Sequence, residues 1–259
     1  MKDPYHTIRE HLKVLKLRKI DAILDDVMAN ALKENLPIST VLEQLFSYEA
    51  QALIERRIER RIKESRLPER KLLADFDFEF QTGINKQQIM ELATLAFVSK
   101  KQGVIIAGSS GTGKSHLTKA LLLIGCNHMY RCRYTSAADM LKTLMSGLPD
   151  NTLDQKLKIY TRPDMLLIDE VGFDRLEQES TRNAALFFKV IDARYGKSST
   201  LMTTNVDFAD LGDYLGDPVI TTAIVDRMVH RSIIINIEGP SWRMHCSKQI
   251  NLESTNPST

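Results

Sequence analysis

The stretch from Val104 to Ser115 reads Val-Ile-Ile-Ala-Gly-Ser-Ser-Gly-Thr-Gly-Lys-Ser. Its four apolar residues predict a buried strand, and the spacing G-x-x-x-x-G-K-[ST] that follows predicts a loop whose backbone N–H groups bind phosphate. The glycines allow positive φ, which brings consecutive N–H groups close to one anion. We therefore expect Lys114 to reach the β and γ phosphates of a nucleoside triphosphate and Ser115 to ligate Mg²⁺.

The alternative for this stretch is a chance match in a glycine-rich turn. An apolar run precedes the loop and an amphipathic helix follows it, as a phosphate-binding loop requires, and the positive end of that helix would point at the anion. Both observations favour the loop. The residues expected to bind the nucleotide are Gly108, Ser109, Ser110, Gly111, Thr112, Gly113, Lys114, Ser115 and His116.

Composition is compatible with a large domain and a small one. The chain has 259 residues, of which 43 % are hydrophobic, and a net charge of +2 that by itself indicates no partner. No stretch is apolar enough to span a membrane, so we expect a cytoplasmic protein without a membrane partner. The cysteines Cys126, Cys132 and Cys246 lack paired spacing and are expected to be free thiols.

Glycine usage indicates a boundary, because all twelve glycines lie at Gly83 or beyond. Apolar residues recur at helical spacing before that point, and the capping box Thr40-x-x-Glu43 predicts a second helix of about 27 residues toward Pro68. We expect a small all-helical N-terminal domain over 1–75, an ATPase domain over 76–250 and a disordered tail over 251–259.

The end of this long helix is basic. Residues 56–71 carry eight basic and three acidic side chains, a net charge of +5. Two interpretations stay open: a solvated face with ion pairs along the helix, or contact with nucleic-acid phosphates through residues such as Arg56, Arg57 and Arg60.

Strands alternate with helices in the second part of the chain. This alternation predicts an α/β fold, a parallel five-stranded sheet covered by helices on both faces. Ligands of such sheets bind beyond the carboxyl ends of the strands, where the phosphate-binding loop also lies. The expected strands are 103–107, 131–135, 164–168, 199–204 and 232–237.

Polar side chains end two further strands. Asp169 and Glu170 directly follow an apolar run, where Asp169 would hold Mg²⁺ through its water shell and Glu170 would orient or deprotonate the water that attacks the γ-phosphate. An ordinary polar turn is the alternative. Asn205 would contact the γ-phosphate or that water, or else form an Asx turn.

Arg227 lies near the end of a predicted helix that begins after Pro218. It would either interact with the helix dipole or act as an arginine finger that neutralises charge in the transition state. The segment Asn205-Val206-Asp207 is not the guanine-reading Asn-Lys-x-Asp, so a GTPase is disfavoured. A small-molecule phosphotransferase would leave Glu170 and Arg227 without a role.

These positions, in this order, resemble the AAA+ ATPases, in particular the clade of the helicase loader DnaC and the transposition helper IstB. The resemblance covers the whole chain, and the helical N-terminus with its Asp-Phe-rich link is more similar to IstB. It implies that Arg227 acts on a neighbouring subunit's ATP. It also implies that Arg243, in Ser241-Trp242-Arg243, contacts the nucleotide in cis, although Trp242 replaces the usual tyrosine.

The resemblance further implies an ATPase that uses ATP and Mg²⁺, forms a homo-oligomer with ATP at subunit interfaces, assembles on duplex target DNA and recruits or activates the transposase of the same element. A helicase loader that prefers single strands is the alternative. In the initiator-type AAA+ proteins that the chain resembles, helices after the second strand face DNA. The candidate contacts in this region are Lys156, Lys158, Arg131 and Arg133.

Overall fold

The computed structural model describes residues 3–172, 181–206 and 218–247. The chain divides into two compact units, residues 1–60 and 61–259, and each is described by itself. The domain boundary expected after residue 75 stays a proposal, and the expected tail over 251–259 lies outside the described residues.

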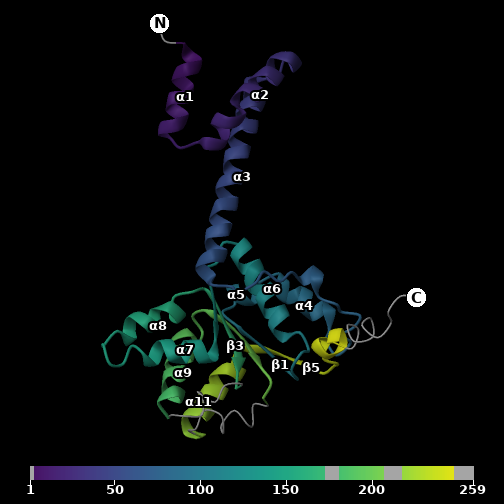
Figure 1. The fold of residues 1–259 in the computed structure, drawn as a ribbon, viewed down its shortest axis with the longest axis vertical. Helices are drawn as coiled ribbons and strands as arrows, with labels where there is room; N and C mark the ends of the chain where they lie inside the picture. Colours follow the sequence, from purple (N-terminus) through teal and green to yellow (C-terminus); the bar gives the residue numbers. More distant parts are fainter. Residues whose placement is uncertain (1–2, 173–180, 207–217, 248–259) are drawn as a thin grey trace, which may run out of the picture. The chain divides into compact units, whose positions relative to one another are not determined.

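Three helices begin the chain (Figure 1). A small core of buried apolar side chains in the first unit contains Leu12, Ile20, Leu24 and Leu45. The long helix begins directly after Pro37, whose carbonyl accepts the N–H groups of Thr40 and Val41. Thr40 therefore lies in the first turn and is not the cap that the sequence predicted. The helices are α1 (Pro4–Val14), α2 (Arg18–Glu34) and α3 (Ile38–Ser65).

The second unit contains a five-stranded sheet in the order β2-β3-β4-β1-β5, and its neighbouring strands pair in parallel. The predicted parallel α/β fold is confirmed, with strand bounds within a few residues of those expected. The apolar runs of β1 and β3 made their bounds readable, because strands buried on both faces are apolar almost throughout. The strands are β1 (Gly103–Gly108), β2 (Cys132–Ser136), β3 (Met165–Val171), β4 (Ser199–Thr204) and β5 (Ser232–Ile237).

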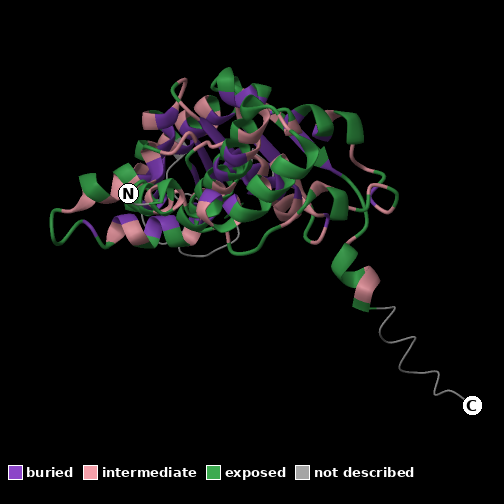
Figure 2. Cartoon of the chain, turned by 90° about the horizontal axis from the view of Figure 1, so that it is seen from above, coloured by how far each residue is buried: buried purple, intermediate pink, exposed green. Residues whose placement is uncertain are grey.

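Helices flank the sheet (Figure 1). One buried cluster joins alternate strand residues such as Leu166 and Ile168 to α7, α9 and α11, while α6 contacts β1 through β4. Figure 2 shows buried residues concentrated around the strands. The bounds are η1 (Leu73–Asp75), α4 (Lys86–Ala93), α5 (Ala96–Ser99), α6 (Lys114–Asn127), α7 (Ala137–Met145), α8 (Leu153–Thr161), α9 (Thr181–Arg194) and α11 (Pro218–His230).

Within the described ranges, every helix is too short or too polar to cross a bilayer. The cysteines Cys126, Cys132 and Cys246 are free, as expected, and the first two are buried.

Candidate nucleotide-binding site

The phosphate-binding loop connects β1 to α6, which is the arrangement that its sequence predicts. Gly113 precedes the first residue of α6 and has a φ of 92°, a left-handed conformation that favours glycine. A Cβ at this position would lie 2.5 Å from Cε2 of Phe76. Gly113 is thus required both by the backbone conformation and by the aromatic ring packed against it.

The Lys114 ammonium folds over this loop. Its Nζ donates to the carbonyl oxygens of Gly108 at 2.7 Å and Ser109 at 2.8 Å. Burial lowers the pKa of Lys114, with Arg243 acting in the same direction and the nearby carboxylates opposing it. The lysine therefore lies where phosphate oxygens would replace the two carbonyls as its partners.

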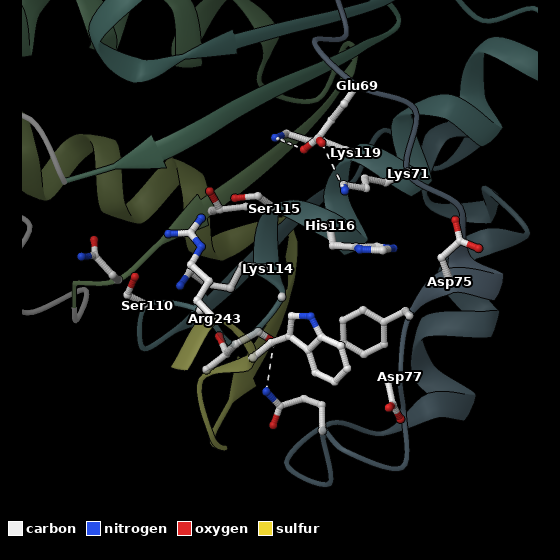
Figure 3. A pocket seen from close by; sticks show the side chains of 18 of the residues that line it. Glu69, Lys71, Asp75, Asp77, Ser110, Lys114, Ser115, His116, Lys119 and Arg243 are labelled. Atoms are coloured by element: carbon white, nitrogen blue, oxygen red, sulfur yellow. Dashed lines mark hydrogen bonds and ion pairs between the residues drawn. The ribbon is translucent and has the colours of Figure 1, made fainter. Parts of the chain in front are cut away.

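A cavity of about 730 Å³ opens beside the loop (Figure 3). Its lining includes most of the predicted nucleotide site, brought together from the loop, the ends of β3 and β4, and the segment after β5. Among predicted residues, the cavity is lined by Ser110, Gly111, Thr112, Gly113, Lys114, Ser115, His116, Glu170, Asn205 and Arg243.

Part of the cavity wall is aromatic, and the sequence did not predict it. Phe80 and Trp242 pack edge to face with ring centroids 4.9 Å apart, and Phe76 packs edge to face on His116 at 5.5 Å. The Phe residues come from the Asp-Phe-rich link at 75–80, for which the sequence predicts only a connection between the two domains. The alternation of Phe with acidic residues was the available signal, because it places the aromatic rings at regular intervals.

Gln81 holds two parts of the site together. Its buried amide nitrogen donates to the carbonyl oxygens of Thr112 at 3.1 Å and Pro240 at 3.2 Å. The N–H of Trp242 donates to the Gly111 carbonyl at 3.0 Å. The phosphate-binding loop is thereby joined both to the Asp-Phe link and to the segment after β5 that contains Arg243.

Asp169 is buried, whereas the neighbouring Glu170 is exposed to solvent. Asp169 is 2 % exposed and accepts hydrogen bonds from the hydroxyls of Ser115, at 2.8 Å, and Thr203. Glu170 is exposed and has a φ of 61°, where the register between β3 and β4 is irregular. Its N–H donates to the Thr203 hydroxyl at 2.9 Å. This irregularity turns the Glu170 carboxylate toward the cavity instead of into the sheet.

The donor set fits Mg²⁺. The Ser115 hydroxyl and the Asp169 carboxylate are hard oxygen ligands beside the phosphate-binding loop. In the described part of the chain there is no group of three or more His, Cys, Asp or Glu suited to a metal. Mg²⁺ needs none, because it is held by one or two protein oxygens together with phosphates and water.

Other predicted residues lie away from the cavity. The guanidinium of Arg227 contacts Asp192 at 2.8 Å and lies over the ring of Phe188. Neither Arg227 nor the DNA-binding candidates line the cavity.

The DNA-binding candidates differ in exposure and in partners. Lys158 is exposed, whereas Lys156 donates to the Ser146 hydroxyl at 3.1 Å. Arg131 binds Asp164 through its backbone N–H and two guanidinium nitrogens, and Arg133 is half-buried. On the long helix, Arg56 pairs with Glu49 at 3.0 Å, while Arg57 and Arg60 are exposed.

The parallel sheet and the loop between β1 and α6 define a P-loop nucleotide-binding fold. The fold is similar to that of a crystallised DNA replication initiation factor, with a TM-score of 0.55 and 22 % identity over 74 % of this chain and 57 % of that chain. The DnaC helicase loader has a TM-score of 0.50 and 22 % identity over 59 % of this chain and 87 % of its own.

Sequence comparison gives the family. A model described as IstB-like ATP binding protein matches residues 10–250, and the chain belongs to this family. An ATP-binding protein of insertion sequence IS232 from Bacillus thuringiensis subsp. berliner is 34 % identical over 96 % of this chain and 99 % of its own.

Proposed function

We propose that this protein hydrolyses ATP with Mg²⁺ while assembled on duplex target DNA, and that it recruits or activates the transposase of the same insertion sequence. The observation that carries the proposal is the exposed Glu170 carboxylate beside the Ser115–Asp169 pair in the cavity of an IstB-like chain. We also propose that the protein acts in the bacterial cytoplasm. We further propose that it consists of a helical domain over 1–75 and an ATPase domain over 76–250.

Each residue of the site has a distinct task in this proposal. Lys114 leaves the carbonyls of Gly108 and Ser109 to bind the β and γ phosphates, and the loop N–H groups bind the remaining oxygens. Mg²⁺, held by Ser115 and Asp169, would neutralise phosphate charge. Glu170 orients the attacking water and receives its proton.

The surroundings complete the site. Asn205 contacts the γ-phosphate or the water, and Arg243 binds the nucleotide from within the same subunit. The wall formed by Phe76, Phe80 and Trp242 offers flat apolar surfaces on which a purine base can stack. Arg227 completes the site of a neighbouring subunit in a homo-oligomer.

A helicase loader is the second candidate, because the fold is similar to that of the DnaC helicase loader. The two functions differ in the nucleic acid that they require. A transposition helper needs duplex target DNA, whereas a loader acts on single strands.

The test compares ATP turnover with duplex and single-stranded DNA at equal nucleotide concentration and constant salt. The proposal predicts stronger stimulation by duplex, together with ATP-dependent retention of the transposase on immobilised duplex that carries this protein. Glu170→Gln gives the background turnover. Stimulation by single strands alone, without retention of the transposase, would support the loader instead.

A further inference from the structure

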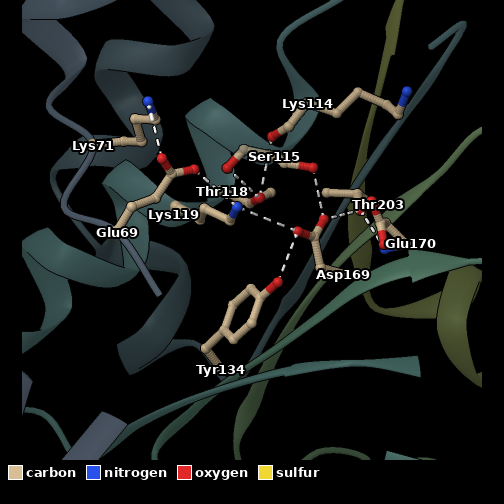
Figure 4. Close-up of polar contacts among 10 residues, drawn as sticks. All are labelled: Glu69, Lys71, Lys114, Ser115, Thr118, Lys119, Tyr134, Asp169, Glu170 and Thr203. Carbon is tan, nitrogen blue, oxygen red and sulfur yellow. Dashed lines mark hydrogen bonds and ion pairs between the residues drawn. The ribbon is translucent and has the colours of Figure 1, made fainter. Parts of the chain in front are cut away.

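Lys119 and Ser115 approach the same carboxylate from one face of α6. They are four residues apart, which places their side chains one above the other on a helix. The Ser115 hydroxyl donates to Oδ1 of Asp169 at 2.8 Å, and Nζ of Lys119 lies 3.8 Å from Oδ2 (Figure 4). The two oxygens of Asp169 therefore face different partners.

The Lys119 ammonium is enclosed. Its side chain is 12 % exposed, and Nζ lies 3.1 Å from Oε1 of Glu69. It also lies 5.5 Å from the ring centroid of Tyr134, whose hydroxyl donates to Oδ2 of Asp169 at 3.3 Å. Hydrogen bonds from Lys119, and to a smaller extent from Lys71, lower the pKa of Glu69. One cation thus lies between two carboxylates that come from distant parts of the sequence (Figure 4).

This arrangement fixes how Asp169 is turned. A buried carboxylate needs partners for both oxygens, and groups behind a metal ligand determine its orientation and its affinity for the metal. Oδ1 is on the side of Ser115, where the metal is expected. Oδ2 is held from behind by Tyr134 and Lys119, so rotation of the carboxylate would break both contacts.

We propose that Lys119 is a positioning residue for Asp169, and that Glu69 shares its ammonium and so ties the segment 66–72 to the magnesium site. The inference rests on the proposed function, in which Ser115 and Asp169 hold the Mg²⁺ of bound ATP. Mg²⁺ would add a second positive charge near the ammonium, and the Glu69 carboxylate offsets this repulsion, so that Lys119 stays beside Asp169 and the Glu69 contact strengthens. Binding of Mg²⁺ and ATP therefore orders the segment 66–72.

The first experiment titrates Lys119→Met with ATP, once in Mg²⁺ and once in EDTA. Trp242 is the only tryptophan of the sequence and lines the cavity, so its fluorescence reports binding. Affinity in Mg²⁺ should fall about 10-fold to 100-fold, the usual loss when a group behind a metal ligand is removed, while affinity in EDTA changes less than about 2-fold. Tyr134→Phe removes only the hydroxyl and should show a smaller loss of the same kind.

Lys71→Met is the matched comparison. Lys71 also contacts Glu69, at 3.1 Å from Oε2, and the substitution removes an equal charge. The ratio of the affinities in Mg²⁺ and EDTA should stay at its wild-type value in this variant. If Lys119→Met lost affinity equally in Mg²⁺ and in EDTA, its role would be merely structural. Unchanged affinity in both buffers would also overturn the proposal.

The second experiment measures hydrogen exchange over 66–72 with and without Mg²⁺ and ATP. Exchange should slow on binding in the wild type, and Glu69→Gln should abolish this slowing while ATP still binds. Equal slowing in both proteins would refute the part assigned to Glu69. If the wild type bound no ATP in Mg²⁺, the proposed function itself would fail. If the wild type bound ATP normally and Lys119→Met bound it with the same affinity, only the role of Lys119 would be refuted.

Discussion

Nε of Arg227 donates to Oδ1 of Asp192 at 2.8 Å, and the same guanidinium lies 4.8 Å from the ring centroid of Phe188. These contacts hold the end of α11 against α9, and Arg227 is absent from the lining of its own subunit's cavity. An arginine held in this way can complete a nucleotide site only when a second subunit presents its cavity to it.

We therefore predict that Arg227→Ala abolishes turnover and that mixing restores it. Arginine fingers are worth about 10³-fold to 10⁵-fold in rate. Arg227→Ala mixed with Lys114→Ala should regain part of the wild-type turnover, because some interfaces then combine an intact loop with an intact arginine. Turnover is followed by phosphate release over a range of mixing ratios. A mixture that co-assembles on DNA without any recovery would contradict action across the interface.

Lys114→Ala and Glu170→Gln should separate binding from hydrolysis. Loss of Lys114 removes a charge-assisted contact to phosphate, so equilibrium binding of ATP should weaken strongly. Glu170→Gln keeps the shape of the exposed side chain but removes the base, so ATP should bind normally and turnover should fall about 10²-fold to 10⁴-fold. Trp242 fluorescence and phosphate release measure the two effects. Wild-type turnover in Glu170→Gln would exclude Glu170 as the base.

The sequence predicted the parts of the site that lie on one continuous motif or at the end of an apolar strand. The loop from Gly108 to Ser115 and the pair Asp169 and Glu170 belong to this group. Their positions follow from the strand before them, because parallel strands present their carboxyl ends at one edge.

The missed contacts join segments that are far apart in sequence. Phe76 packs on Gly113, Gln81 joins Thr112 to Pro240, and Lys119 lies beside Glu69. Periodicity within one element carries no information about such pairs. The helix begins at Ile38, and the Pro37 carbonyl accepts the N–H groups of Thr40 and Val41, so Thr40 lies inside the first turn and not at the cap.

Glu49 provides the next prediction, which concerns stability. α2 receives no side-chain hydrogen bond from its own N-cap residue, Leu17, and Glu49 of α3 instead accepts the N–H groups of Lys19 at 2.7 Å and Ile20 at 3.2 Å. Burial raises the pKa of Glu49, but these donors and Arg56 outweigh it, so the pKa lies below its usual value. Glu49→Gln should lower the free energy of unfolding by about 1 kcal/mol at neutral pH.

The pH dependence of this effect has a definite sign. Because folding lowers the pKa of Glu49, its stabilisation is present above the unfolded-state pKa and is lost as the pH falls through the folded-state value. The difference between wild type and Glu49→Gln should therefore shrink from about pH 5 downward. Urea unfolding followed by far-ultraviolet circular dichroism measures it. A difference that stays constant down to acid pH would rule out the ionised carboxylate as its source.

The last prediction separates the candidate DNA contacts by their partners. Lys158 is exposed on α8, whereas Arg131 is engaged by Asp164 and Arg133 is half-buried. Phosphate contacts release counterions, so log affinity falls with log salt, and each lost contact reduces the magnitude of this negative slope by about one. Lys158→Ala should reduce the magnitude of the slope by about this amount per subunit. Adding Lys156→Ala should reduce it further. Anisotropy titrations on random duplex at several salt concentrations, with a non-hydrolysable ATP analogue, measure the slope.

The matched control for this prediction is Lys189→Ala, which removes an equal charge from an exposed position on α9. Its slope should equal that of the wild type, because no DNA contact is assigned to it. Arg131→Ala should have a smaller effect than Lys158→Ala, since Asp164 already neutralises the guanidinium. If Lys158→Ala and Lys189→Ala gave the same slope, the DNA-binding surface would lie elsewhere, and Arg57 and Arg60 on α3 would be the next residues to substitute.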